Sequence, residues 1–124
     1  MPDPCARETF EAARLDWSCR EQTDHVEWLQ LFRDLLAIRR RQIRPLLRLI
    51  QPGQAQNCAP GALRAAWPLS DGRTLTVMCN LSAAEVAMPV AETGTLIYMT
   101  PSDAVIGTLP PWTTQWRVGR TDDG

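Results

Sequence analysis

The sequence predicts an α+β fold that is mainly β, with one long N-terminal helix followed by a small antiparallel β-sandwich or sheet domain. Two observations carry this prediction. Hydrophobic residues recur at helical spacing from Asp24 to Arg41. From Ala62 onward the spacing changes to the two-residue alternation of strands, in short segments separated by turn residues. A chain of 124 residues, 44% of them hydrophobic, has the size and composition of about one soluble domain.

Residues 1–23 precede the long helix. Pro2 and Pro4 favour an extended start, and Arg7 to Arg14 are compatible with a short helix around Phe10. Trp17 is then expected to bring a large aromatic side chain into the core beside the main helix. Together with the helix, this stretch is assigned to a first region, residues 1–44.

The long helix is predicted over Asp24–Arg41. Asp24 and Glu27 are spaced like a capping pair, and Pro45 ends the helix at or before Arg44 because proline cannot continue the hydrogen-bond ladder. Structural positions on its apolar side include Trp28, Phe32, Leu35 and Arg39.

The apolar arc of this helix spans roughly 180°, wider than the roughly 100° stripe that packing on one surface requires. Arg39 falls inside the arc, where its charge must pair or extend to water. Two interpretations stay open. The segment is either a core helix with an arginine stem along its edge, or a helix covered on two sides, one of them by something absent from this chain.

Residues 45–60 are predicted to form a connector, punctuated by proline and glycine, and its apolar residues are expected to pack back on the helix. These apolar residues are Leu46, Leu47, Leu49 and Ile50. Residues 61–120 form the predicted antiparallel β domain, and 121–124 a tail.

The β domain begins with a predicted hairpin that turns at Asp71-Gly72. Pro68 lacks an amide proton, so the end of the first strand is expected at a sheet edge. Three further strands are predicted over 86–90, 95–100 and 113–118, joined by turns at 92–94 and 101–111. The inward positions of the hairpin are Leu63, Ala65, Trp67, Leu69, Leu75, Val77 and Cys79.

Composition excludes several classes of function. The net charge of −1 gives no general attraction to nucleic acid or anionic lipid, and no apolar run approaches the roughly 18 residues of a membrane span. The N-terminus has no export signal, which predicts a cytoplasmic protein with reduced cysteines. All 13 basic residues are arginine, so lysine-based chemistry is excluded.

No group of residues indicates an active site, and no catalytic, cofactor-binding or metal-binding residue is assigned. His25 is the only histidine and lies in the first turn of the helix, where the helix dipole disfavours its charged form. The four cysteines have no metal-site spacing. The glycosylation sequon Asn80-Leu81-Ser82 is interpreted as hydrogen bonding at a strand end.

Two further groups of residues have alternative readings. The arginines between Arg39 and Arg48 form either a solvated helix end or a site for an anion or partner. Trp67, Trp112 and Trp116 are either core residues or a platform on which sugar rings stack. Alternation of Trp116 with Val118 on one strand face favours the core.

Several motifs together resemble the C-terminal portion of malto-oligosyltrehalose trehalohydrolase, a glycoside hydrolase of the α-amylase superfamily. The specific pieces are the Leu-Asp-Trp of the run Asp3 to Trp17, and the Leu-Pro-Pro-Trp of Leu109 to Val118. The helix ending LFRDLLAIRRR and the segment Gly61 to Ser82 are similar too. The resemblance covers nearly the whole chain.

The resemblance implies that the helix is the last helix of a (β/α)8 barrel, followed by the C-terminal β domain. Enzymes of this family cleave the α-1,4 bond next to a terminal trehalose with two carboxyl groups at the ends of barrel strands. No residue here corresponds to them, so the chain is expected to be an inactive fragment of a cytoplasmic enzyme of trehalose biosynthesis. It needs no cofactor, and its expected partner is the parent's catalytic barrel.

Alternatives remain beside this expectation. One alternative is that the chain is a stand-alone carbohydrate-binding module that holds α-glucan, or a protein-interaction module. Another alternative is that the parent is a glycogen-branching or debranching enzyme. In each case the bare outer face of the helix predicts self-association of the isolated chain.

Overall fold

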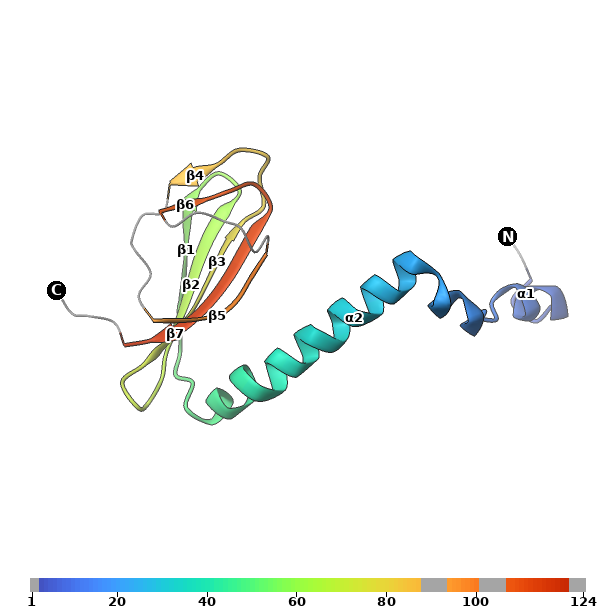
Figure 1. Ribbon diagram of the computed structural model, residues 1–124, viewed down its shortest axis with the longest axis horizontal. Helices are drawn as coiled ribbons and strands as arrows, with labels where there is room; N and C mark the ends of the chain where they lie inside the picture. Colours follow the sequence, from blue (N-terminus) through green and yellow to red (C-terminus); the bar gives the residue numbers. More distant parts are fainter. Residues whose placement is uncertain (1–2, 88–93, 101–106, 121–124) are drawn as a thin grey trace. The chain divides into compact units, whose positions relative to one another are not determined.

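The computed structural model describes residues 3–87, 94–100 and 107–120. The chain divides into two compact units, which are Met1–Ala37 and Ile38–Gly124. We call them the helical unit and the sheet unit, and each is described by itself. Figure 1 shows both and gives the labels used below.

The helical unit begins with the short helix α1 (Arg7–Ala12) and a 3-10 turn, η1 (Trp17–Glu21). In α1, Arg7 forms an ion pair with Glu11 one turn later, at 2.8 Å. Asp16 caps η1 by accepting hydrogen bonds from the backbone N–H and hydroxyl of Ser18. The Arg20 guanidinium lies 5.5 Å from the centre of the Trp17 ring.

The long helix α2 spans Thr23–Ile38, so the predicted helix exists but starts one residue earlier. The N–H of Val26 already bonds to the carbonyl of Gln22. Asp24 therefore lies inside the first turn instead of capping it, and the predicted capping pair is wrong. The carboxylate still suits the positive end of the helix dipole.

Beyond Ile38 the chain stays helical but changes its winding. Arg39–Ile43 form a single π-helical turn (η2), and Arg44–Arg48 a 3-10 turn (η3) with Pro45 in its first turn. Proline is tolerated there because its missing N–H would have no helical partner. None of the helices among the described residues is long and apolar enough to span a membrane.

Five antiparallel strands form the main sheet, in the order β1-β2-β3-β7-β5. Their bounds are Gln54–Ala59, Ala62–Pro68, Thr74–Asn80, Thr113–Gly119 and Thr95–Thr100 respectively. Two short strands, β4 (Val86–Ala87) and β6 (Thr108–Leu109), pair separately. The predicted α+β class, with its small antiparallel sheet domain, is confirmed.

The predicted hairpin is present between β2 and β3. Leu69 donates to the carbonyl of Arg73 at 2.7 Å, and Gly72 takes a φ of 81°, a conformation that glycine adopts readily. Pro68 does not lie on an edge strand, because β2 is flanked by β1 and β3. It lies instead beyond the last β1–β2 residue pair, Gln54 with Ala66, where no ladder bond is lost.

The predicted connector 45–60 is corrected in two respects. Its second half is strand β1, whose polar residues lack the alternation that predicts a strand. Its apolar first half packs on the sheet. Leu46 is buried with Leu69 and Leu75, and Ile43, Leu49 and Ile50 pack around them.

The sheet buries residues on both faces of its central strand, β3. On one face, Leu75 belongs to the cluster of Leu46, Leu69 and Leu75, which we call the Leu46 cluster, and Val77 lies on the same side. Thr76, Met78 and Asn80 are buried on the opposite side. The predicted strand 95–100 has the bounds observed for β5, and 113–118 those of β7 to within one residue. Of the predicted strand 86–90, only Val86 and Ala87 are strand among the described residues, and β6 occupies part of the segment expected to be a turn.

Candidate functional site

The described residues contain no assembled acid–base or metal site. Asp16, Asp71 and Arg73 have shifted pKa values, and each belongs to a turn. The Ser18 hydroxyl and N–H lower the pKa of Asp16, while a side-chain hydrogen bond from Arg73 lowers the pKa of Asp71. Within the described part of the chain, no group of three His, Cys, Asp or Glu side chains has metal-binding geometry.

The three candidate sugar-stacking tryptophans do not share one role. The rings of Trp67 and Trp116 stack on each other, with centres 6.1 Å apart and planes 2° from parallel. Both are half-buried and pack against the Leu46 cluster, so they belong to the core of the sheet unit. Gly53 reinforces this packing, because a Cβ there would overlap Cδ1 of Trp67. Trp112 alone is well exposed, with 65% of its surface open to solvent.

Trp112 also has an unusual backbone. Its φ is 58°, in the left-handed region that bulky side chains rarely adopt. It follows Pro110 and Pro111 and directly precedes β7. The Leu-Pro-Pro-Trp motif therefore forms a tight turn that exposes one indole ring to solvent. Hydrophobic patterning does not reveal this exposure.

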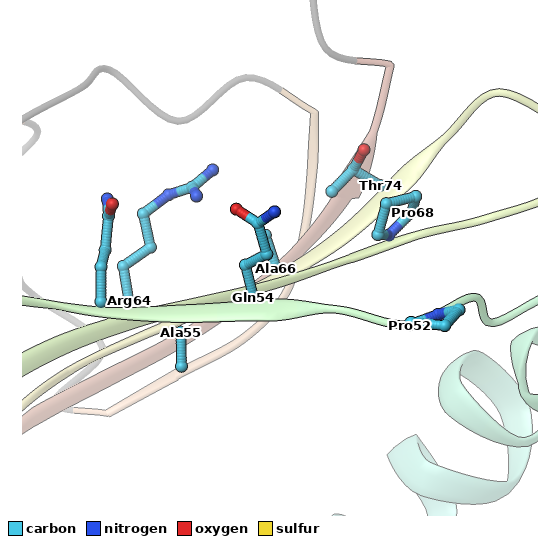
Figure 2. Close-up of a pocket in the computed structure, with 8 residues that line it drawn as sticks. Pro52, Gln54, Ala55, Arg64, Ala66, Pro68 and Thr74 are labelled. Carbon is cyan, nitrogen blue, oxygen red and sulfur yellow. The ribbon is translucent and has the colours of Figure 1, made fainter.

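A polar groove of about 290 Å³ lies along β1 and β2. Figure 2 shows Gln54, Arg64 and Thr74 projecting from the same side of the sheet, with Ala55 on the other. Such amides and a guanidinium offer hydrogen-bond donors but no catalytic group. The groove opens along β1, which is an edge strand. The sequence did not predict β1, and so it did not predict the groove.

The helical unit exposes apolar side chains, and none of its described residues is buried. Trp28 and Phe32, one turn apart on α2, have ring centres 6.4 Å apart, and about 60% of each side chain is exposed. Trp17 is 65% exposed, so its prediction as a core anchor is wrong for this chain. We call the exposed apolar residues of this unit the apolar helical surface: Phe10, Leu15, Trp17, Val26, Trp28, Leu31, Phe32 and Leu36.

Two other predicted structural residues of the long helix are also not buried. Leu35 is half-buried, and Arg39 is exposed at the start of the π-helical turn. The remaining arginines up to Arg48 are exposed too, which agrees with a solvated helix end. His25 is exposed in the first turn of α2.

Comparison with known proteins shows what this chain is similar to. Residues 58–116 match the model of a family described as a domain of unknown function, DUF3459. The chain also superposes on part of the 1.4 Å crystal structure of a Salmonella typhimurium protein designated an α-amylase, with a TM-score of 0.82 and 30% identity. That match covers 96% of this chain and 20% of the Salmonella protein.

Curated relatives agree. A malto-oligosyltrehalose trehalohydrolase from Brevibacterium helvolum is 34% identical over 116 residues, 90% of this chain but only 19% of that protein. The enzyme of the same name from Deinococcus radiodurans is 48% identical over 40 residues, which are 32% of this chain and 7% of the relative. The chain thus spans about a fifth, or less, of the proteins it matches.

The chain is therefore similar, along nearly all of its length, to the C-terminal portion of glycoside hydrolases of the α-amylase superfamily. Within that class its resemblance is to malto-oligosyltrehalose trehalohydrolase, as the motifs around Trp17 and Trp112 predicted. The 124 residues hold a five-stranded antiparallel sheet and are too few for a (β/α)8 barrel of about 200 residues or more.

Proposed function

We propose that this chain is the C-terminal accessory portion of a malto-oligosyltrehalose trehalohydrolase, which releases trehalose by hydrolysing the α-1,4 bond beside it. The cleaving carboxyl groups belong to a catalytic barrel outside these 124 residues. The chain itself contributes a docking helix and a β domain and is inactive alone. Two of the matched relatives are trehalohydrolases, and one is designated an α-amylase. These matches support this substrate over those of branching or debranching enzymes.

The apolar helical surface is the observation that carries the proposal. Large side chains such as Trp28 and Phe32 are normally buried in a folded domain, yet no described residue of the helical unit is buried. Large exposed apolar patches mark interfaces, and Trp28 and Phe32 lie next to each other on α2. The proposed occupant is the catalytic barrel, since the matched relatives are about five times as long as this chain.

The sheet unit plays a different part in the proposed enzyme. It has a core of its own around Leu46, Leu69 and Leu75. It fits the role of a stable appended domain. A cytoplasmic location accords with the four unpaired cysteines.

An activity assay tests the first half of the proposal. Purified chain incubated with maltotriosyl trehalose is expected to release no trehalose, whereas the Brevibacterium helvolum trehalohydrolase under the same conditions does. Trehalose release by the chain alone would overturn the assignment of catalysis to an absent barrel, provided that the release persists after contaminating enzymes have been removed.

A binding assay tests the docking surface. Brevibacterium helvolum trehalohydrolase truncated to remove the matching 19% is mixed with this chain, and the complex is measured by sedimentation. The double variant Trp28→Ser/Phe32→Ser is expected to weaken association, and Gln30→Ala on the polar side of α2 is the matched control. Equal binding by both variants would show that another surface docks.

The same variants address the chain by itself. Wild-type chain is expected to self-associate as its concentration rises, because only a second copy is available to cover the apolar helical surface. Trp28→Ser/Phe32→Ser is expected to remain monomeric. A wild-type chain that stays monomeric at millimolar concentration would argue against an interface on α2.

A further inference from the structure

Trp112 occupies a backbone conformation that its own side chain disfavours. At φ 58° it is the single non-glycine residue with positive φ among the described residues. Asparagine and glycine adopt this region most readily, whereas a bulky residue there is an outlier. Local conformation therefore gives no reason for a tryptophan at this position.

Core packing gives no reason either. Trp112 is 65% exposed, while Trp67 and Trp116 of the same unit stack together against the core. A side chain that strains the backbone and stays in water contributes little to folding. Such outliers persist where they serve recognition.

The loop that carries Trp112 is anchored by hydrogen bonds from a buried side chain. Asn80 is fully buried, and its side-chain amide donates to the carbonyl oxygens of Leu109 at 2.9 Å and Pro110 at 3.0 Å. Leu109 and Thr113, on either side of the Pro-Pro-Trp segment, are also buried. The backbone that carries the indole is thus held in place, which lowers the entropy cost of ordering this loop when a ligand binds.

A shallow depression lies at the same end of the sheet. Ala62 pairs with Asn80, and Asn80 pairs with Thr113, so the β2 side of the depression lies two strand spacings, about 10 Å, from the start of β7. The depression measures about 320 Å³. Its lining residues are Asn57, Ala59, Pro60, Gly61, Ala62, Leu63 and Leu81.

The chemistry of these residues selects the kind of ligand. None of the lining residues, nor Trp112, is ionisable, so the surface offers nothing to a phosphate or an acidic peptide. An indole face and exposed Leu81 suit an apolar surface, and the Asn57 amide suits hydroxyl groups. A chain of pyranose rings combines apolar C–H faces with a rim of hydroxyls and is long enough to span the distance.

We propose that Trp112 is the stacking residue of a surface site for a neutral α-glucan chain, which extends from the indole toward the depression at Leu81. The glucan class rests on the proposed function, which takes a maltooligosaccharide derivative as substrate. The site would hold substrate chains near the enzyme without taking part in cleavage.

The test is a titration of the full chain with maltoheptaose, followed by tryptophan fluorescence and by affinity electrophoresis in soluble starch. Trp112→Ala is expected to weaken binding roughly tenfold or more, the scale of losing one stacked aromatic. Trp112→Phe keeps a ring and is expected to recover part of the affinity. Leu96→Ala, an exposed apolar residue on β5, is the matched control and should bind as wild type does.

Folding failure is excluded by a second variant. Trp112→Gly relieves the positive φ, so it is expected to be at least as stable as wild type to urea and still to lose glucan binding. Glucan binding by Trp112→Gly equal to wild type would overturn the proposal, as would no binding by wild-type chain at millimolar maltoheptaose.

The outcome is separable from that of the proposed function. If the chain docks on the truncated trehalohydrolase but binds no maltoheptaose, only the glucan site fails. If Trp112→Ala abolishes docking and leaves glucan binding intact, Trp112 belongs to the protein interface and the glucan site is wrong. Glucan binding without any docking would instead favour a stand-alone module.

Discussion

The two units of this chain bury their apolar residues to opposite extents. In the sheet unit, Leu75 and Met78 are almost inaccessible, and polar residues such as Asn80 are buried with hydrogen-bond partners. In the helical unit the large residues Trp17, Trp28 and Phe32 all remain mostly in water. Hydrophobic content alone therefore does not identify a core. The sheet unit has a buried core, whereas the helical unit leaves its large apolar residues exposed.

The largest effect is expected where burial is most complete. Asn80→Asp would place a carboxylate against the carbonyl oxygens of Ala84, Leu109 and Pro110, which the amide now contacts. An uncompensated buried charge costs about 3–5 kcal/mol, so most of the stability of the sheet unit should be lost. Urea denaturation of the whole chain, followed by tryptophan fluorescence, measures it. Ser82→Ala removes only one partner and is the milder control; equal effects would contradict this account of Asn80.

Truncation of one apolar residue in each unit tests the comparison directly. Leu75→Ala opens a cavity in the core and should destabilise the chain by about 2–5 kcal/mol. Phe32→Ala, in the apolar helical surface, should change the unfolding free energy of the chain by less than about 0.5 kcal/mol. Both are read from urea midpoints at low protein concentration, where self-association is suppressed. A Phe32→Ala effect as large as that of Leu75→Ala would mean that the helical unit has a core of its own.

A smaller effect is expected at the tight contact between Gly53 and Trp67. A Cβ at position 53 would overlap Trp67 and approach the carbonyl oxygen of Ala66 to 2.6 Å. Gly53→Ala should cost about 1–3 kcal/mol, the usual range for overpacking, and should disturb the Trp67–Trp116 stack. Near-ultraviolet circular dichroism reports the stack. Gly72→Ala, where a Cβ meets nothing within 4 Å, carries only the backbone cost of its positive φ and should leave the stack unchanged.

The smallest expected effect concerns acid. The folded pKa of Asp71 lies below its ordinary value because Arg73 hydrogen-bonds the carboxylate. A depressed folded pKa contributes stability above the unfolded value, near 3.8, and that contribution is lost as the pH falls through the folded pKa. Asp71→Asn should therefore flatten the pH dependence of the sheet unit below about pH 4. Thermal melts between pH 2 and 6 with an unchanged slope would show that the turn pair has no role.

Sequence patterns predicted the elements whose side chains alternate or recur in step with the backbone. The helix around Phe32, the hairpin at Gly72 and the strand ending in Val118 all have such a period. Strand β1 was missed because its polar residues give no alternation, and its pairing with β2 is made by backbone groups. The second buried face of β3 was missed because Thr76 is polar and Asn80 was interpreted only as hydrogen bonding at a strand end.

The candidate site was predictable only in part. A role for Trp112 in stacking was open from the sequence, but its separation from Trp67 and Trp116 was not, since stacked rings and a positive φ leave no mark on hydrophobic pattern. Trp17 was expected in a core because large aromatics are usually buried. In the structure Trp17 is instead 65% exposed and has the Arg20 guanidinium beside its ring.

The buried amide of Asn80 has a consequence for how the protein can be made. Asn80-Leu81-Ser82 is the chain's one acceptor sequence for N-linked glycans, and glycan attachment modifies the same side-chain nitrogen that contacts Leu109 and Pro110. In the folded chain that nitrogen is shielded, so an oligosaccharide can be attached only before the sheet closes. A secretory host would thus produce two populations, one folded without sugar and one glycosylated and unable to complete the end of the sheet.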